Sequence, residues 1–485
     1  MNRWFGLVCA FCITADAAAI DGVVGPDNCD EAGFSSVLAT VDGSGGGAIT
    51  FDCGDAATFA FTSYKTIQNA VTIDGAGRVT FDGGDASAFF EVAENASATL
   101  QHLTLQHGAF AGSHALENRG QLTLWDVRVI LNTSTESAVL NYGRMDVLSS
   151  TFGGNASDGT GGAISNANAT PGGTGRGGVL VVAYSTFEAN TSASSGGAIY
   201  NNAASAYLTN VTLSGNTATA GGAIDASGGG VYVRMSTFGD NHATDDKGGA
   251  MRIEDSLLDL ESTNIVDNTA ATNGGGLSCQ VAPAGSSSIH ATTFAGNSAG
   301  GDGGGAYSEC GLGFADVTFN ANTANGRGGA IAAGGAGSES FDFATIDANT
   351  ATLGGGLHAE AGAAIAIGDS IVSANTGGNC DGALTSNGHN LSDNADCAAV
   401  FTATGDVLDA ALPLMELGDY GGGTLTQPPS SDSAAFDHIP PDACHPSPLW
   451  DARNAIRPVG AGCDSGAVEL GGVVDFILVN AFESG

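Results

Sequence analysis

Basic residues are scarce in this chain of 485 residues, which has 13 Lys and Arg against 51 Asp and Glu and a formal net charge of −38. So few cations leave little to neutralise nucleic-acid phosphates, and an anionic lipid surface would repel the chain. Proline is also scarce, with 11 residues, whereas glycine reaches 76. A hydrophobic content of 42% is too high for a disordered acidic chain. The composition therefore favours a folded, glycine-rich β protein with an acidic exterior.

Long apolar segments are missing as well. The apolar run at residues 4–15 has 12 residues, which is too short to span a bilayer. It follows Arg3 and precedes the small residues Ala17 and Ala19, as in a cleavable secretory signal peptide. We therefore predict a signal peptide at residues 1–19, no transmembrane span in the mature chain, and a secreted or outer-membrane, cell-surface location.

The ten cysteines predict a disulfide framework. Cys9 and Cys12 fall within the predicted signal peptide, so eight remain in an oxidising compartment. None of these eight has the Cys-x-x-Cys spacing that would indicate a zinc or redox site. Eight cysteines allow 105 connectivities, but here they lie in neighbouring pairs. We expect the disulfides Cys29–Cys53, Cys279–Cys310, Cys380–Cys397 and Cys444–Cys463.

A phrase of about 26 residues recurs through the middle of the chain. It reads Thr-Phe-x-x-Asn and then Gly-Gly-Ala-Ile, as at residues 186–190 with 196–199. Apolar and polar residues alternate between these marks, which is typical of strands. After Asn132, the asparagines form a column of equivalent positions: Asn155, Asn190, Asn216, Asn241, Asn268, Asn297, Asn322, Asn349 and Asn375.

This period predicts an all-β fold, a right-handed parallel β-helix with three strands per coil. Leucine-rich repeats have a similar length, but they need a Leu-x-x-Leu-x-Leu framework that is missing here. In the predicted coils, Phe187 and Phe238 occupy one interior file, and the paired glycines supply positive φ at a turn. The column asparagines are expected to end strands in the left-handed conformation and to form a ladder of amides, a structural role. The same register puts Cys279 and Cys310 in adjacent coils.

The paired phrases resemble the repeats of the polymorphic outer membrane proteins, bacterial β-helical surface proteins that include adhesins. The resemblance covers roughly residues 150–360. Members of that family typically end in an autotransporter barrel. From Cys380 onward, however, this chain is poor in aromatics, carries four cysteines and lacks the strand pattern of a barrel. The resemblance therefore implies a surface β-helix without self-translocation.

Different segments flank the predicted β-helix of residues 66–376. Residues 20–65 are expected to cap its N-terminal sheet edge. Residues 377–470, with the phrase Arg457-Pro458-Val459-Gly460, are similar to the choice-of-anchor modules that follow β-helices in exported bacterial proteins. Residues 471–485 form a C-terminal tail that also resembles the ending of such proteins.

Candidate site residues are few. Asp240 and Asp267 precede column asparagines in consecutive coils, so their carboxylates would lie about 5 Å apart. We expect two solvated turn residues and no bound cofactor. The pair is nevertheless close enough to share a cation, so Ca²⁺ is the candidate metal there, and a catalytic dyad is the other alternative. The surrounding segment is rich in charge, with Asp245, Lys247 and Arg252.

Parallel β-helices also host pectate lyases and polygalacturonases, so the function depends on the site and not on the fold. Glycoside hydrolysis needs two carboxylates at a defined separation. The Asn-Thr-Asp, Gly-His-Gly and Arg-Ile-Lys signatures of polygalacturonases are absent, and few basic residues are present to hold an anionic polysaccharide. We predict a monomeric, non-enzymatic adhesive or structural protein with no catalytic residues and with a carbohydrate or cell-surface ligand. A polysaccharide-active enzyme, pectate lyase-like or glycoside hydrolase, is the alternative.

Overall fold

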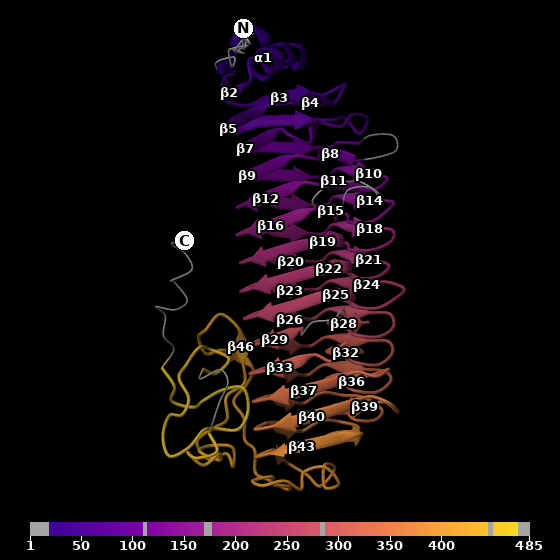
Figure 1. The fold of residues 1–485 in the computed structure, drawn as a ribbon, viewed down its shortest axis with the longest axis vertical. Coiled ribbons are helices and arrows are strands. Elements are labelled where there is room, and N and C mark those ends of the chain that lie inside the picture. The colour runs from indigo at the N-terminus through magenta and orange to yellow at the C-terminus, as the bar shows by residue number, and fades with distance from the viewer. Residues whose placement is uncertain (1–18, 110–113, 169–176, 282–286, 445–449, 474–485) are drawn as a thin grey trace, which may run out of the picture.

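The computed structural model describes residues 19–109, 114–168, 177–281, 287–444 and 450–473. The predicted signal peptide and the end of the tail fall almost entirely outside these ranges. Strands take up 48% of the structure and helices 4%. The strands pair in parallel and wind into a solenoid of about 13 turns, which Figure 1 shows as an upright rod. The predicted parallel β-helix is confirmed.

Each repeat forms one coil with three kinds of strand. The strands that carry the Thr-Phe phrase pair along the axis and comprise β13 (Thr151–Gly153), β17 (Thr186–Glu188), β20 (Thr212–Ser214), β23 (Thr237–Gly239), β26 (Asn264–Val266), β30 (Thr293–Ala295), β34 (Thr318–Asn320), β38 (Thr345–Asp347), β41 (Ile371–Ser373) and β44 (Leu391–Ser392). The short strands that follow the column asparagines make a separate eight-stranded sheet of β10 (Thr133–Ser134), β14 (Ala156–Ser157), β18 (Thr191–Ser192), β21 (Thr217–Ala218), β24 (His242–Ala243), β27 (Thr269–Ala270), β31 (Ser298–Ala299) and β35 (Thr323–Ala324).

The Gly-Gly-Ala-Ile phrase leads into the third strand of the coil, which in some coils bends and continues as one long strand. These strands are β11 (Ser137–Asn141), β15 (Ile164–Ala167), β19 (Ile199–Thr209), β22 (Ile224–Arg234), β25 (Met251–Glu261), β28 (Leu277–Gln280), β32 (Ala306–Ser308), β36 (Ile331–Ala333), β39 (Leu357–Ala359) and β42 (Cys380–Gly382). Where the bend interrupts the strand, its second part is β12 (Arg144–Leu148), β16 (Val179–Ala183), β29 (Ser288–His290), β33 (Gly313–Ala315), β37 (Ser338–Asp342), β40 (Ala364–Gly368) or β43 (Leu384–Gly388).

The first coils have weaker sequence marks but join the same sheet. Their strands are β1 (Gly22–Val24), β2 (Gly46–Phe51), β3 (Ala57–Ala60), β4 (Lys65–Ile67), β5 (Ala70–Asp82), β6 (Phe90–Val92), β7 (Ser97–Gln106), β8 (His114–Asn118) and β9 (Gln121–Ile130). Solenoid pairing therefore begins within residues 20–65 and continues to Ser392, so it extends beyond the 66–376 segment expected from the repeat at both ends.

A helix covers the N-terminal end of the rod (Figure 1). After the short 3₁₀ turn η1 (Pro26–Asn28), α1 (Glu31–Gly43) begins at Asp30, whose side chain accepts a hydrogen bond from the Gly33 amide at 2.8 Å. Its residues Phe34, Leu38 and Val41 are buried against the first strands. Because this apolar face covers an otherwise open end of the core, α1 has the position expected of a cap.

Identical side chains stack in the interior of the solenoid. The Phe152 and Phe187 rings are parallel with centroids 4.7 Å apart, and Phe294 and Phe319 repeat this at 4.6 Å. The register pairs Ile199 with Ile224 in the neighbouring file. These spacings match the distance between hydrogen-bonded strands, so each coil buries its apolar residues against its neighbours.

The column asparagines form a continuous buried ladder. In each step the Nδ2 group of one asparagine donates to Oδ1 of the next, for example from Asn190 to Asn216 at 2.9 Å. The expectation that these asparagines adopt the left-handed conformation is wrong. The residue before each one takes positive φ instead, as at Ala189 and Asp240. This exposed residue makes the turn. The side chain of the following asparagine therefore points into the interior and forms hydrogen bonds with the backbone.

All four expected disulfides are present. The Cα atoms are 5.7 Å apart in Cys29–Cys53, 5.8 Å in Cys279–Cys310, 5.1 Å in Cys380–Cys397 and 5.7 Å in Cys444–Cys463. The first ties the segment before α1 to the end of β2, and the second crosses between adjacent coils.

The C-terminal region packs against the side of the rod. We call the described residues between 413 and 473 the lateral module. It contains the small hairpin of β45 (Gly418–Asp419) and β46 (Leu425–Thr426) and lies beside the last coils in Figure 1. The Leu425 amide donates to Asn264 at 2.9 Å, and the Ala467 amide donates to Thr345 at 3.0 Å. None of the helices in the described ranges is long and apolar enough to cross a membrane.

Candidate functional site

Asp240 and Asp267 occupy equivalent positions in consecutive coils, as the repeat predicts. Both are left-handed turn residues, with φ of 55° and 56°. They follow strands β23 and β26, which pair in register. Across the described residues, no group of three His, Cys, Asp or Glu side chains is arranged to hold a metal ion. A Ca²⁺ ion on this pair stays a prediction, and its remaining ligands would have to be backbone oxygens or water.

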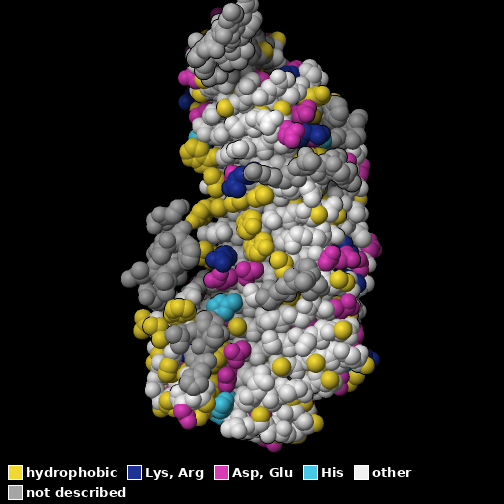
Figure 2. Space-filling model, in the orientation of Figure 1, with side chains coloured by type: hydrophobic (Ala, Val, Ile, Leu, Met, Phe, Trp, Pro, Cys, Tyr) yellow, Lys and Arg dark blue, Asp and Glu magenta, His cyan; other side chains and the backbone are white. Residues whose placement is uncertain are grey.

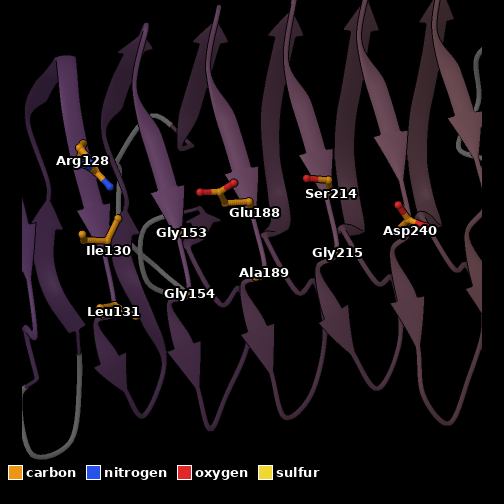
Figure 3. A pocket seen from close by; sticks show the side chains of 10 residues that line it. All are labelled: Arg128, Ile130, Leu131, Gly153, Gly154, Glu188, Ala189, Ser214, Gly215 and Asp240. Carbon is orange, nitrogen blue, oxygen red and sulfur yellow. The ribbon is translucent and has the colours of Figure 1, made fainter.

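Asp240 lies at one end of a shallow hollow of about 520 Å³ on the outside of the rod. Figure 3 shows Arg128, Glu188, Ser214 and Asp240 on neighbouring coils around it. The hollow exists because the repeat places glycines at 153, 154 and 215, where other coils carry side chains. It is open to solvent, and it does not place two carboxylates opposite each other across a gap.

The charged segment after Asp240 resolves into a structural ion-pair cluster. Arg252 Nε lies 3.0 Å from Asp225 Oδ2, and Arg252 also approaches Glu254 at 3.3 Å and Asp246 at 3.8 Å. Burial raises the pKa of Asp225 to about 6, although Arg252 counteracts the rise. Because the Asp225 side chain is fully buried, a polysaccharide has no access to it. This carboxylate therefore fits a structural role better than a catalytic one.

A face beside the hollow exposes large apolar side chains. β9 carries Trp125, whose ring is tilted against His102 with centroids 4.9 Å apart, and Trp125 pairs with Leu148 in the next coil. Two coils farther along, the Tyr207 and Tyr232 rings are stacked at 4.8 Å. We define the apolar face by its five exposed members: Trp125 at 46%, Leu131 at 50%, Leu148 at 38%, Tyr184 at 52% and Tyr207 at 42%.

The apolar face is continuous with the hollow. The same strand, β9, turns Trp125, Arg128 and Ile130 outward, and Leu131 follows in the turn. In Figure 2, hydrophobic side chains gather on this side of the rod, just N-terminal of the lateral module. Soluble proteins seldom leave aromatic side chains clustered in water without a use for them.

Inspection of the sequence missed the apolar face. Trp125, Tyr184 and Tyr207 are separated in the chain and belong to repeats whose other outward positions are polar. The sequence alone does not give the exact alignment of one coil with the next. Without that register, outward-pointing residues of different coils cannot be assigned to one face. A second buried ladder was missed for the same reason. Its members, Asn118, Asn141, Asn166 and Asn201, donate in turn at 2.7 Å per step.

Comparison with known families supports the reading of the repeat. Residues 184–202 and 316–334 match the Chlamydia polymorphic membrane protein repeat. These two stretches of the chain are similar to that repeat. In the structure each matched stretch runs from a turn through a Phe file residue and a column asparagine to the Gly-Gly phrase. No curated protein matches the chain. No solved structure matches it either.

Proposed function

We propose that this protein is an exported, non-enzymatic β-solenoid that adheres at the cell surface, and that its apolar face binds a neutral glycan chain. The observation that carries the proposal is the exposure of Trp125, Tyr184 and Tyr207 together on one side of the rod. The polymorphic membrane protein repeat supports a surface role.

Glycan chemistry fits this face better than other ligands do. Aromatic rings offer apolar area with few rotatable bonds, and the C–H faces of sugars pack well on such surfaces. Tyr hydroxyl groups and the carboxylate of Glu188 at the hollow supply hydrogen-bond partners for sugar hydroxyls. A net charge of −38 opposes an anionic polysaccharide, so the proposed chain is uncharged.

The regular rise of the coils gives the face a repeating character. Trp125 and Leu148 are one coil apart, and Tyr207 and Tyr232 are again one coil apart. The two pairs lie in rows two residues apart along the strands, because Trp125 and Leu148 align with Ala183, whereas Tyr207 aligns with Val181. A linear polymer that crosses both rows would meet several ring and apolar contacts. Many weak contacts add up to useful retention without any deep pocket.

The test is affinity electrophoresis of the mature protein through gels that contain a neutral polysaccharide, such as a glucan or a mannan. Trp125→Ala and Tyr184→Ala should each weaken retention at least about fivefold, which corresponds to about 1 kcal/mol of lost ring contact. Tyr420→Ala is the matched control, because Tyr420 is also an exposed tyrosine but lies on the lateral module. Equal retention of all variants would refute the proposed site.

The enzyme alternative predicts a different pattern. An active site would need converging carboxylates in an open groove, and the hollow brings Glu188 and Asp240 no nearer than two coils apart. Release of reducing ends from the same polysaccharides, abolished by Asp240→Ala, would favour that alternative.

A further inference from the structure

The lateral module is fastened to the solenoid by a fully buried arginine. The Arg457 side chain has no exposed surface. Its Nη2 group donates to Asp316 Oδ1 of the solenoid at 2.9 Å and to the Gly466 carbonyl at 2.9 Å. Its guanidinium also lies over the Phe343 ring, 4.2 Å from the centroid. One cation of the module is thus enclosed between the two parts of the chain.

Carboxylates outnumber cations around Arg457. The solenoid contributes Asp316, Asp342 and Asp369 from successive coils, and the module contributes Asp464 and Glu469. Figure 2 shows acidic and histidine side chains along the seam between rod and module.

Two histidines of the solenoid also lie at the seam. His290 Nε2 lies 3.4 Å from Asp316, and His389 Nδ1 lies 3.2 Å from Asp369. Farther out in the module, Arg453 is already paired with Asp451 at 2.7 Å. If all five carboxylates were ionised, Arg457 alone would have to balance most of their charge in a poorly hydrated interface.

We propose that Arg457, ion-paired with Asp316, and the surplus carboxylates Asp342, Asp369, Asp464 and Glu469 form a proton-dependent clamp. The clamp holds the lateral module on the solenoid while the surplus carboxylates retain protons, and it loosens as they ionise. The inference concerns the fold of the whole chain and does not depend on the proposed glycan.

The acid–base properties of the seam agree with this geometry. Burial and the neighbouring charges of Asp369 and Asp316 together raise the pKa of Asp342 to about 7, although Arg457 counteracts the rise. Burial also raises the pKa of Glu469 to about 7. Burial is also the main cause of the raised pKa values of Asp316, Asp369 and Asp464.

The sign of the pH dependence follows from linkage. Solvated carboxylates lose their protons near pH 4, so the docked state binds more protons than the undocked state between about pH 4 and pH 7. Docking therefore weakens as the pH rises through this window. His438, next to His389 and bonded to the Gly405 carbonyl, acts in the opposite sense, because burial lowers its pKa. Protonation of His438 in acid thus opposes docking, and docking is strongest in mildly acidic solution.

Opening the clamp would uncover the side of the last coils. Asn264, Thr293 and Thr345 now bond to the module, and Phe343 packs against Ile439. These residues lie on the continuation of the apolar face toward the C-terminal end of the rod. A rise in pH would therefore lengthen the surface open to a partner.

Hydrogen exchange of the intact mature protein at about pH 6 and about pH 8.5 tests the clamp, with rates corrected for the intrinsic effect of pH. The amides of Gly466 and Ala467 bond across the seam, to Asp369 and Thr345. They should lose protection at least about tenfold at the higher pH, whereas amides of β19 and β22 should not change. Unchanged protection of Gly466 and Ala467 would overturn the proposal.

Two variants separate the clamp from general destabilisation. Asp342→Asn removes a titrating charge that makes no direct bond to Arg457, so it should reduce the pH effect at least about threefold and increase protection at the higher pH. Asp126→Asn is the control, because Asp126 is an exposed left-handed turn residue in a coil that the module does not cover. If Asp342→Asn retained the full pH effect, the clamp would be wrong.

Discussion

At the scale of single residues, the fold depends on buried asparagines. Their side chains form hydrogen bonds with the backbone and with the asparagine side chains of neighbouring coils. Asn241 is representative: its Oδ1 accepts from the side chain and the main chain of Asn216, both at 3.0 Å, and its Nδ2 donates to the Leu213 carbonyl at 3.0 Å. The Asn241 side chain is almost fully buried. Every polar atom that it satisfies would otherwise lie unpaired in the interior.

We expect Asn241→Ala to lower the free energy of unfolding by about 2–3 kcal/mol. The buried backbone N–H of Asn216 loses its acceptor, the Asn216 side-chain amide loses one of its two acceptors, and Asn268 Oδ1 loses one of its two donors. Urea unfolding followed by circular dichroism measures this loss. Asn202→Ala is the control, because Asn202 is an exposed strand residue of the same repeat type. An equal effect of both substitutions would show that the ladder contributes no special stability.

At the scale of one coil, the sequence was sufficient to predict the architecture. Repeated phrases align Phe with Phe and Gly-Gly with Gly-Gly, and a parallel solenoid is the arrangement that buries such columns together. The register was accurate enough to bring Cys279 and Cys310 together. Positions of the turns were predicted less well. The residue before each asparagine has the left-handed φ. Because this position is Ala in some coils and Asp or Gly in others, the sequence has no recurring residue that marks the turn.

Removal of the Cys279–Cys310 disulfide tests the stability of a coil. Replacing both cysteines by serine should cost about 3 kcal/mol for a closed loop of this size and should speed amide exchange in β28 and β32. Removing Cys444 and Cys463 in the same way serves as the control, because that bond lies in the lateral module. If both double variants accelerated exchange in β28 and β32 equally, the Cys279–Cys310 disulfide would not stabilise its own coils specifically.

At the scale of the whole molecule, the two candidate functional regions were not predictable from the chain alone. Arg457 and Asp316 are 141 residues apart, and no local pattern connects an arginine in an irregular segment with one turn of a solenoid. The apolar face likewise arises from residues of several repeats that the winding brings together. Both features result from packing between distant segments, whereas the coil itself is encoded locally and repeatedly.

On the proposed function, the rod binds a neutral glycan on its apolar face without cleaving it. One measurement tests this most directly: the mature protein is incubated with a neutral polysaccharide that retains it, and the bound fraction and the polymer length are followed together. We predict retention that depends on Trp125 and Tyr184, with polymer length unchanged after prolonged incubation. Shortening of the polymer, or retention that survives loss of both aromatic residues, would show that the apolar face is not a non-catalytic glycan-binding site.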